Sequence, residues 1–248
     1  MQTEAGVTFE PEGWQSQKRI LVILAHPDDP EFFCGATIAR WCAEGHEVHY
    51  CLLTRGQKGA PDLTHSADEI AVLRVKEQLA AAEFLGVKSV EFMDYQDGEL
   101  FPDLEMRKKA VRVIRRIKPD ILITSDPLNL FPTDNRINHP DHRAAGQVVI
   151  DAAFPAAGNP MFFPELIRDE NLEPHSIEEI WLSATAQPNF YIDVFDYFEA
   201  KLKAIQRHAS QIQRDSEAFE KMMRARITID AGTGKNVFEE RFKRLKFT

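Results

Sequence analysis

RILVILAHPDDPEFFCG, residues Arg19–Gly35, is the stretch that decides the fold. Its first part, Ile20–Ala25, is an unbroken apolar run, which is typical of a central parallel strand covered on both faces. The run stops at a histidine, a proline and two adjacent aspartates. At the carboxyl end of a buried strand, neighbouring acids and an imidazole are unfavourable unless a cation or a substrate takes up their charge. The stretch therefore predicts a strand that ends in a ligand site.

Strands and helices alternate downstream of this stretch. We expect a helix that begins near Pro30 and ends before Gly45, because the first helical turn tolerates proline and glycine terminates helices. Further strands are expected at His49–Leu53, Val90–Met93 and Asp120–Ser125, and further helices at Asp68–Leu85, Leu104–Ile117 and Pro140–Phe154. This spacing indicates right-handed βαβ units. The predicted fold class is α/β: a Rossmann-like, mostly parallel sheet flanked by helices, with an elaborated C-terminal part.

Beyond Phe154 the pattern loosens into sequence rich in proline and aromatic residues. The elements expected there are strands at Ile177–Ser183 and Phe190–Asp193, helical spacing from Phe195 toward Ile212, a polar helical stretch and a terminal element around Val237–Lys246. A chain of 248 residues suits one substantial α/β domain. We divide it into an N-terminal arm (1–18), a Rossmann-like core (19–155) and a C-terminal elaboration (156–248).

Composition excludes several classes of partner. The net charge of −9 and the lack of long basic clusters argue against a nucleic-acid partner. No apolar segment reaches membrane-spanning length, and Met1–Lys18 lacks the apolar core of a signal peptide, so we expect a cytoplasmic protein without a membrane partner. The cysteines Cys34, Cys42 and Cys51 have no CxxC spacing, which predicts buried free thiols.

Two short segments share an unusual signature, His26-Pro-Asp-Asp29 after the first strand and His139-Pro-Asp-His142 after the strand at 120–125. The tips of parallel strands open on one edge of a sheet, so the two segments should converge. Mixed imidazole and carboxylate ligands are typical of catalytic zinc. A single copy could be a turn with a helix-capping aspartate. Two copies favour a metal site, because capping leaves three histidines unexplained.

The segments AHPDDPEFFCG and NHPDHRAAG resemble the PIG-L/LmbE-like family, zinc-dependent deacetylases that remove N-acetyl groups from glucosamine-containing compounds. The likeness covers most of 19–213, and it extends to the LTRGQKG loop, Arg74-x-x-Glu77, Asp97–Gly98 and the RHASQ segment with His208. Many members have glutamate directly after the paired aspartates, where this chain has Pro30 and then Glu31.

The resemblance implies a role for each motif residue. It implies that His26, Asp29 and His142 bind zinc, with Fe²⁺ or Co²⁺ as other candidate metals. Asp28 would be the general base toward water at the metal. His139, as an imidazolium, would stabilise the oxyanion or help the amine to leave. Asp141 would lie near His139 and raise its pKa by charge.

Substrate contacts are expected around the same mouth. Arg74 and Asp97 match positions that the family uses to hold sugar hydroxyls, and a helix-surface arginine with a turn aspartate is the alternative for them. Arg55 and Arg136 lie in loops, where a positive pocket could receive a carboxylate or phosphate on the aglycone. Plain solvated loop residues are the alternative for these two.

The resemblance implies hydrolysis of the acetyl amide of an N-acetylglucosamine-type sugar or sugar conjugate, by a protein that is a homo-oligomer like related enzymes. One alternative keeps the site but cleaves another acyl amine or a thiol-conjugate amide. A nucleotide-binding module without hydrolysis is disfavoured, because no GxGxxG follows the first strand and Asp28 and Asp29 would repel phosphates. A catalytically silent metal scaffold is disfavoured, because it would need neither Asp28 nor His139.

Overall fold

The computed structural model describes residues 12–60, 62–212 and 216–247, which contain a seven-stranded sheet with the order β3-β2-β1-β4-β5-β9-β6. The strands are β1 (Arg19–Leu24), β2 (Glu47–Thr54), β3 (Ser89–Tyr95), β4 (Ile121–Ser125), β5 (Glu179–Ser183), β6 (Phe190–Asp193), β7 (Thr228–Ile229), β8 (Asn236–Val237) and β9 (Glu239–Lys246). The helices are α1 (Asp29–Ala43), α2 (Ala67–Leu85), α3 (Leu104–Ile117), α4 (Pro140–Asp151), α5 (Pro164–Glu170), α6 (Phe198–Ile205), α7 (Ala209–Ile212) and α8 (Ser216–Arg224). The prediction of a mostly parallel, Rossmann-like α/β fold is confirmed.

The strand order places the loops after β1 and β4 next to each other. From β1 the chain builds β2 and β3 on one side and then returns to build β4 on the other side, with parallel pairing throughout. Ligands in open α/β sheets bind outside the carboxyl ends of the strands where the order reverses in this way. The two His-Pro-Asp segments therefore flank the reversal point.

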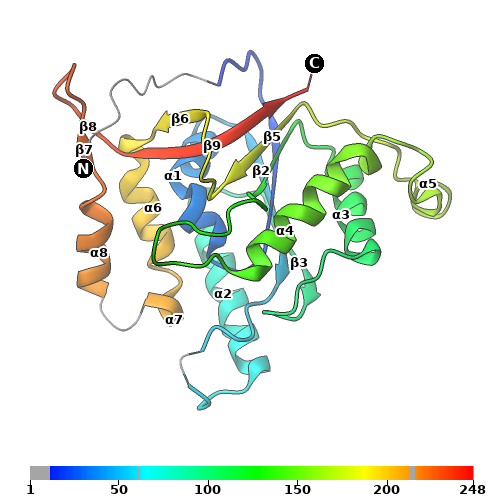
Figure 1. The fold of residues 1–248 in the computed structure, drawn as a ribbon, viewed down its shortest axis with the longest axis horizontal. Helices are drawn as coiled ribbons and strands as arrows, with labels where there is room; N and C mark the ends of the chain where they lie inside the picture. The colour runs from blue at the N-terminus through cyan, green and yellow to red at the C-terminus, as the bar shows by residue number, and fades with distance from the viewer. Residues whose placement is uncertain (1–11, 61, 213–215, 248) are drawn as a thin grey trace.

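Helices cover both faces of the sheet. Alternate residues of β1 point to opposite faces, so Ile20 and Val22 join the core with α1 and α6, whereas Leu21 and Ile23 join the core with α3 and α4. In Figure 1, α3 and α4 lie to the right of the sheet, and α1 and α6 lie to its left. Burial on both faces explains the unbroken apolar run of this strand.

The C-terminal part completes the same sheet. Strand β5 pairs in parallel with β4, and β9 runs antiparallel between β5 and β6. Figure 1 shows β9 crossing the top of the molecule beside β5. The predicted C-terminal strands are thus part of the central sheet.

Helix α1 is kinked at Cys34, which has the non-helical angles φ −145° and ψ 24°. At the kink, backbone N–H and C=O groups of α1 form hydrogen bonds with buried side chains from the C-terminal part. The Lys201 ammonium donates to the carbonyl of Phe32 at 2.8 Å, and the Glu240 carboxylate accepts from the amide of Thr37 at 2.8 Å. Lys201 and Glu240 also form an ion pair with each other. The C-terminal part therefore fixes the shape of the first helix after the HPDD segment.

Two predicted helices are shorter than expected. The helix predicted at 140–154 ends at Asp151 and continues as a π-helical turn, Ala152–Ala157, in which Phe154 is extended with φ −136° and ψ 127°. A residue that precedes proline avoids the helical conformation, which explains the change before Pro155. The helical spacing toward 212 is divided into a 3-10 turn (195–197), α6 and α7.

The described part of the arm, residues 12–18, covers the edge of the core. The Trp14 ring lies 5.3 Å from that of Trp41 and 5.7 Å from that of Trp181. The prediction for residues 1–11 lies outside the described residues. The cysteines are free thiols, as predicted, with Cys42 only partly buried. Among the residues that the structure describes, no helix is both long and apolar enough to cross a bilayer.

Candidate metal centre and active site

The structure brings the two His-Pro-Asp segments together. His26 follows β1, while His139 caps the N-terminus of α4 and His142 lies in its first turn. The ring of His26 is 4.7 Å from that of His139 and 5.2 Å from that of His142, measured between centroids. Residues more than a hundred positions apart thus form one cluster at the end of the parallel strands.

His26, Asp29 and His142 form one group whose ligand atoms all lie within 4.8 Å of one another. Asp29 Oδ1 is 3.1 Å from His142 Nε2, and Asp29 Oδ2 is 3.4 Å from His26 Nδ1. Burial alone would raise the pKa of Asp29, but the charges and hydrogen bonds of the two imidazoles outweigh it and lower that pKa. Two ring nitrogens and an ionised carboxylate are a donor set that suits a divalent transition metal.

The second nitrogen of each histidine in this group has its own partner. His26 Nε2 is 3.1 Å from Asp97 Oδ1 and 3.2 Å from Asp141 Oδ2, and His142 Nδ1 is 3.0 Å from Asn138 Oδ1. Because carboxylate oxygens only accept hydrogen bonds, the partners favour protons on these outer nitrogens. His26 Nδ1 and His142 Nε2 are then free to bind a metal, in the arrangement typical of metal-binding histidines.

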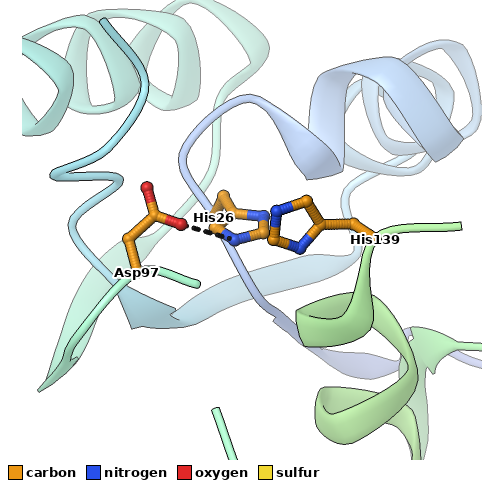
Figure 2. A group of neighbouring side chains, drawn as sticks. All are labelled: His26, Asp97 and His139. Atoms are coloured by element: carbon orange, nitrogen blue, oxygen red, sulfur yellow. Dashed lines mark ion pairs between the residues drawn. The ribbon is translucent and has the colours of Figure 1, made fainter. Parts of the chain in front are cut away.

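A second group contains His26, Asp97 and His139 (Figure 2). It shares His26 with the first group but would use Nε2, which already faces two carboxylates. Figure 2 shows Asp97 and His139 approaching His26 from opposite sides, Asp97 from the loop after β3 and His139 from the start of α4. The first group is the better metal candidate, because its two histidines each have an outer hydrogen-bond partner.

Asp28 has an unusual backbone conformation, with φ 85° and ψ −27°. A left-handed conformation costs a residue other than glycine about 1–3 kcal/mol. Its carboxylate accepts a hydrogen bond from Arg74 at 3.2 Å. Burial raises the pKa of Asp28 to about 6, although the charge of Arg74 opposes the rise and Asp29 adds to it. A carboxylate with this pKa can exchange a proton near neutral pH.

Arg74 is engaged within the protein. Its side chain is only 5% exposed, and it donates to the carbonyls of Pro27 at 2.6 Å and Gly56 at 3.1 Å. A Cβ at Gly56 or Gly59 would lie 2.3 or 2.4 Å from Arg74 Nη1, so glycines are required where the loop covers the guanidinium. Arg74 therefore holds Asp28 and this loop, and a sugar contact stays a prediction for it.

Asp97 also faces the protein interior. It is 5% exposed and accepts a hydrogen bond from the amide of Lys58 at 2.9 Å as well as facing His26. Burial would raise the pKa of Asp97, but the hydrogen bond from His26 is the main cause that lowers it to about 2. The observed contact of Asp97 is thus with a candidate metal ligand.

Asp141 differs most from its expected position. Its carboxylate accepts from the amides of Gly98 at 2.7 Å and Leu100 at 3.2 Å and faces His26, whereas only its backbone amide contacts His139. Burial opposes the change, yet the hydrogen bonds from His26 and Gly98 lower the pKa of Asp141. The Asp141 carboxylate therefore contacts the candidate metal ligand His26, whereas His139 was its expected partner.

His139 is exposed at the mouth of the site. Partial desolvation and the positive charges of His26 and His142 lower its pKa, and they outweigh the opposite effect of Asp141 and Asp97. This direction is opposite to the one expected from the charge of Asp141. His139 Nδ1 accepts a hydrogen bond from the amide of Asp141 at 3.2 Å, which places the proton of the neutral ring on Nε2.

The other two predicted substrate residues lie on the surface. Arg55 forms an ion pair with Asp94, and both line a shallow pocket of about 410 Å³ together with Gln57, Asp68, Ala71, Val72 and Gln96. Arg136 is exposed in the loop after β4. Substrate binding by these two arginines stays a prediction.

Sequence reasoning assigned no role to several residues that shape the site. Asn138 directly precedes the second motif and binds His142, so its position was the only available signal. Glu31 and His208 are fully buried and lie 3.1 Å apart, although they are 177 positions apart in the chain. His208 was noted only because related proteins often carry histidine there. Gln78 binds Glu31, and no sequence pattern around Gln78 indicated a role for it.

The RHASQ segment ties the C-terminal part to the site. The amide and hydroxyl of Ser210 both donate to the Glu77 carboxylate, at 2.8 and 2.6 Å. Gln211 Nε2 donates to the carbonyl of Gly59 at 3.0 Å. The segment therefore fixes both α2 and the glycine loop that covers Arg74.

Comparison with known proteins gives concordant matches. The model of the PIG-L family, described as GlcNAc-PI de-N-acetylase, matches residues 21–153. The chain is 39% identical over 205 residues to the diacetylchitobiose deacetylase of Thermococcus kodakarensis, covering 82% of this chain and 74% of that protein. It is 35% identical over 174 residues to the 1D-myo-inositol 2-acetamido-2-deoxy-alpha-D-glucopyranoside deacetylase of Streptomyces avermitilis, covering 60% of this chain and 57% of that longer protein. The solved structure of the N,N'-diacetylchitobiose deacetylase from Pyrococcus horikoshii matches with a TM-score of 0.81 and 33% identity, covering 92% of this chain and 84% of that one.

Proposed function

The chain belongs to the PIG-L family of deacetylases, and we propose that it uses His26, Asp29 and His142 to hold a divalent metal at which an N-acetylglucosamine-type sugar loses its acetyl group. Its enzyme class is that of a hydrolase of N-acetyl amides. The observation that carries the proposal is the convergence of these three ligands beside Asp28 and His139. When bound, such a metal would make water more acidic and polarise the amide carbonyl.

Asp28 acts as the general base in this proposal. Its carboxylate lies next to the ligand Asp29 and takes a proton from the attacking water. Arg74 keeps this carboxylate in place and favours its ionised form, which is the form that a base requires. The same proton can then pass to the amine nitrogen as the C–N bond breaks, which yields acetate and the free amine.

His139 stabilises negative charge as a neutral donor. Because its pKa is lowered and its Nδ1 accepts a backbone hydrogen bond, the ring presents an N–H at Nε2. A donor that points at the developing oxyanion stabilises the transition state more than the planar amide. His139 is exposed at the mouth, where an entering substrate can reach it.

The first substrates to test are the two that the relatives suggest, N,N'-diacetylchitobiose and an N-acetylglucosaminyl inositol, with another acyl amine as comparison. Purified protein loaded with Zn²⁺, Fe²⁺ or Co²⁺ should release acetate from at least one N-acetylated sugar, and a chelator should abolish the release. Absence of stoichiometric metal together with absence of acetate release after metal addition would contradict the proposal. Preferential cleavage of the non-sugar amide would assign a different substrate class.

Five further expectations are part of the proposal. We take zinc as the metal, because two nitrogens and one oxygen with an open position suit it. A cytoplasmic location and a homo-oligomeric state are also proposed, the second from the resemblance to related enzymes. A single domain over 1–248 agrees with the one central sheet that joins the core and the C-terminal part. Neither nucleic acid nor a membrane is expected as a partner, given the net charge of −9.

A further inference from the structure

A line of buried hydrogen bonds runs from the turn between α6 and α7 to the backbone of Asp28. Gln78 on α2 is fully buried, and its Oε1 accepts from the amide of Asp28 at 2.8 Å. Its Nε2 donates to the two carboxylate oxygens of Glu31 at 3.0 and 3.1 Å. His208 Nε2 lies 3.1 Å from Glu31 Oε2. Three fully buried side chains thus end at the main chain of the proposed base.

The chemistry of the three side chains fixes the direction of this line. A carboxylate accepts hydrogen bonds and cannot donate them when ionised, so the NH₂ end of the Gln78 amide must face Glu31. The oxygen end of the amide then faces Asp28. The second contact of Glu31, with a nitrogen of the fully buried His208, restrains the carboxylate. Glu31 and His208 therefore determine which end of Gln78 meets the backbone.

Asp28 needs such a restraint because its φ of 85° is one that residues other than glycine rarely adopt. Arg74 and Gln78 are four positions apart and lie on the same face of α2. Arg74 binds the Asp28 carboxylate and the carbonyl of Pro27, while Gln78 binds the Asp28 amide. One helical face therefore restrains both the side chain and the main chain of this residue.

We propose that Gln78, with its amide oriented by Glu31 and His208, is a positioning residue that holds Asp28 in the left-handed conformation from which its carboxylate faces the metal site. The inference rests on the proposed function, because it treats Asp28 as the base. Gln78 does not touch the substrate. Its effect should therefore appear in turnover and not in substrate or metal binding.

The first test replaces Gln78 by methionine, which keeps the length of the side chain and removes both hydrogen bonds. In the zinc-loaded full chain, we expect kcat to fall about 100-fold, since small displacements of a reacting group have effects of this size. The KM and the metal content should stay near the wild-type values. Gln147→Met is the matched control, because this glutamine of α4 is exposed and its side chain donates to Asp151. A Gln78→Met enzyme that melts at a lower temperature but keeps the wild-type kcat when folded and metal-loaded would overturn the proposal.

The second test exchanges the amide and the carboxylate between positions 78 and 31. Gln78→Glu alone sets two carboxylates against each other and should lower kcat about as much as Gln78→Met. The double variant Gln78→Glu/Glu31→Gln restores one carboxylate and one amide, and the side chain at position 78 can still accept from the Asp28 amide. Most of the lost kcat should return. Failure of the double variant to exceed Gln78→Glu, with both proteins folded and metal-loaded, would contradict the role of Glu31 in orienting the amide.

A crystal structure of Gln78→Met provides a readout that is independent of the substrate. We expect Asp28 to leave the left-handed region and its carboxylate to move away from Arg74. An unchanged Asp28 would overturn the inference, whatever the activity. If wild-type protein hydrolysed none of the N-acetylated sugars, the proposed function would fail, while this structure would still decide whether Gln78 positions Asp28.

Discussion

The segment that follows β1 and the segment at the start of α4 both read His-Pro-Asp, but their aspartates point in different directions. Asp28 is left-handed, and its carboxylate contacts Arg74. Asp141 lies in the first turn of α4, and its carboxylate turns inward to two backbone amides and to His26. The two segments show that backbone conformation, as much as residue type, decides which contacts an aspartate makes.

The largest effect should come from removing the base. Asp28→Ala should lower kcat about 10³- to 10⁴-fold, at the upper end of what general acid–base groups contribute. The metal content should be unchanged, because the candidate ligands are intact. Steady-state rates with metal analysis check both statements. Asp94→Ala, which removes an exposed aspartate that pairs with Arg55, is the control. Retention of more than a tenth of the activity would mean that another group is the base.

The corresponding change at the start of α4 should act on metal binding. The two carboxylate oxygens of Asp141 contact His26 and accept hydrogen bonds from two backbone amides. An asparagine side chain has only one oxygen that can accept hydrogen bonds. Asp141→Asn should therefore weaken metal binding about 10- to 100-fold, as other changes to groups that orient metal ligands do. Calorimetric titration of the metal-free protein measures this loss. Asp151→Asn on the same helix should bind metal like wild type, and equal affinities of the two variants would refute the supporting role.

A smaller effect is expected where the glycine loop covers Arg74. A Cβ at Gly56 would lie 2.3 Å from the guanidinium, so Gly56→Ala must displace Arg74 or the loop. We expect a kcat about tenfold lower, because Asp28 loses part of its restraint. Gly45→Ala is the control, since Gly45 also has a positive φ of 88° but no atom within 4 Å of the added Cβ. Equal activities of the two variants would contradict a role for this contact.

The smallest expected effect is the fall of kcat/KM at acidic pH. The raised pKa of Asp28, about 6, means that the carboxyl gains a proton as the pH falls through this value and can then no longer accept one from water. A bound cation would lower this pKa, so kcat/KM should fall at most about fourfold between pH 7 and pH 5.5. Rates measured over this range test the assignment. A limb well above pH 7 would point to a different group.

The sequence was sufficient for the features that depend on residue pattern. The apolar run of 20–25 and the helix–strand spacing predicted the parallel sheet, and the position of the two motifs at strand ends predicted their convergence. The direction of the Asp141 side chain was mispredicted, because it depends on how α4 is rotated against the loop that carries Gly98. The same limit applies to Gln78, whose partners are brought to it only by tertiary packing.

The line that ends at Asp28 also has a consequence for the order in which the site can form. All the candidate metal ligands have been synthesised by residue 142, whereas Lys201, His208 and Glu240 belong to the last part of the chain. At a translation rate of about 5–20 residues per second, these three residues are synthesised several seconds after the candidate ligands. A nascent chain therefore contains the candidate ligand residues before it contains His208, which contacts Glu31 in the line of hydrogen bonds that ends at Asp28.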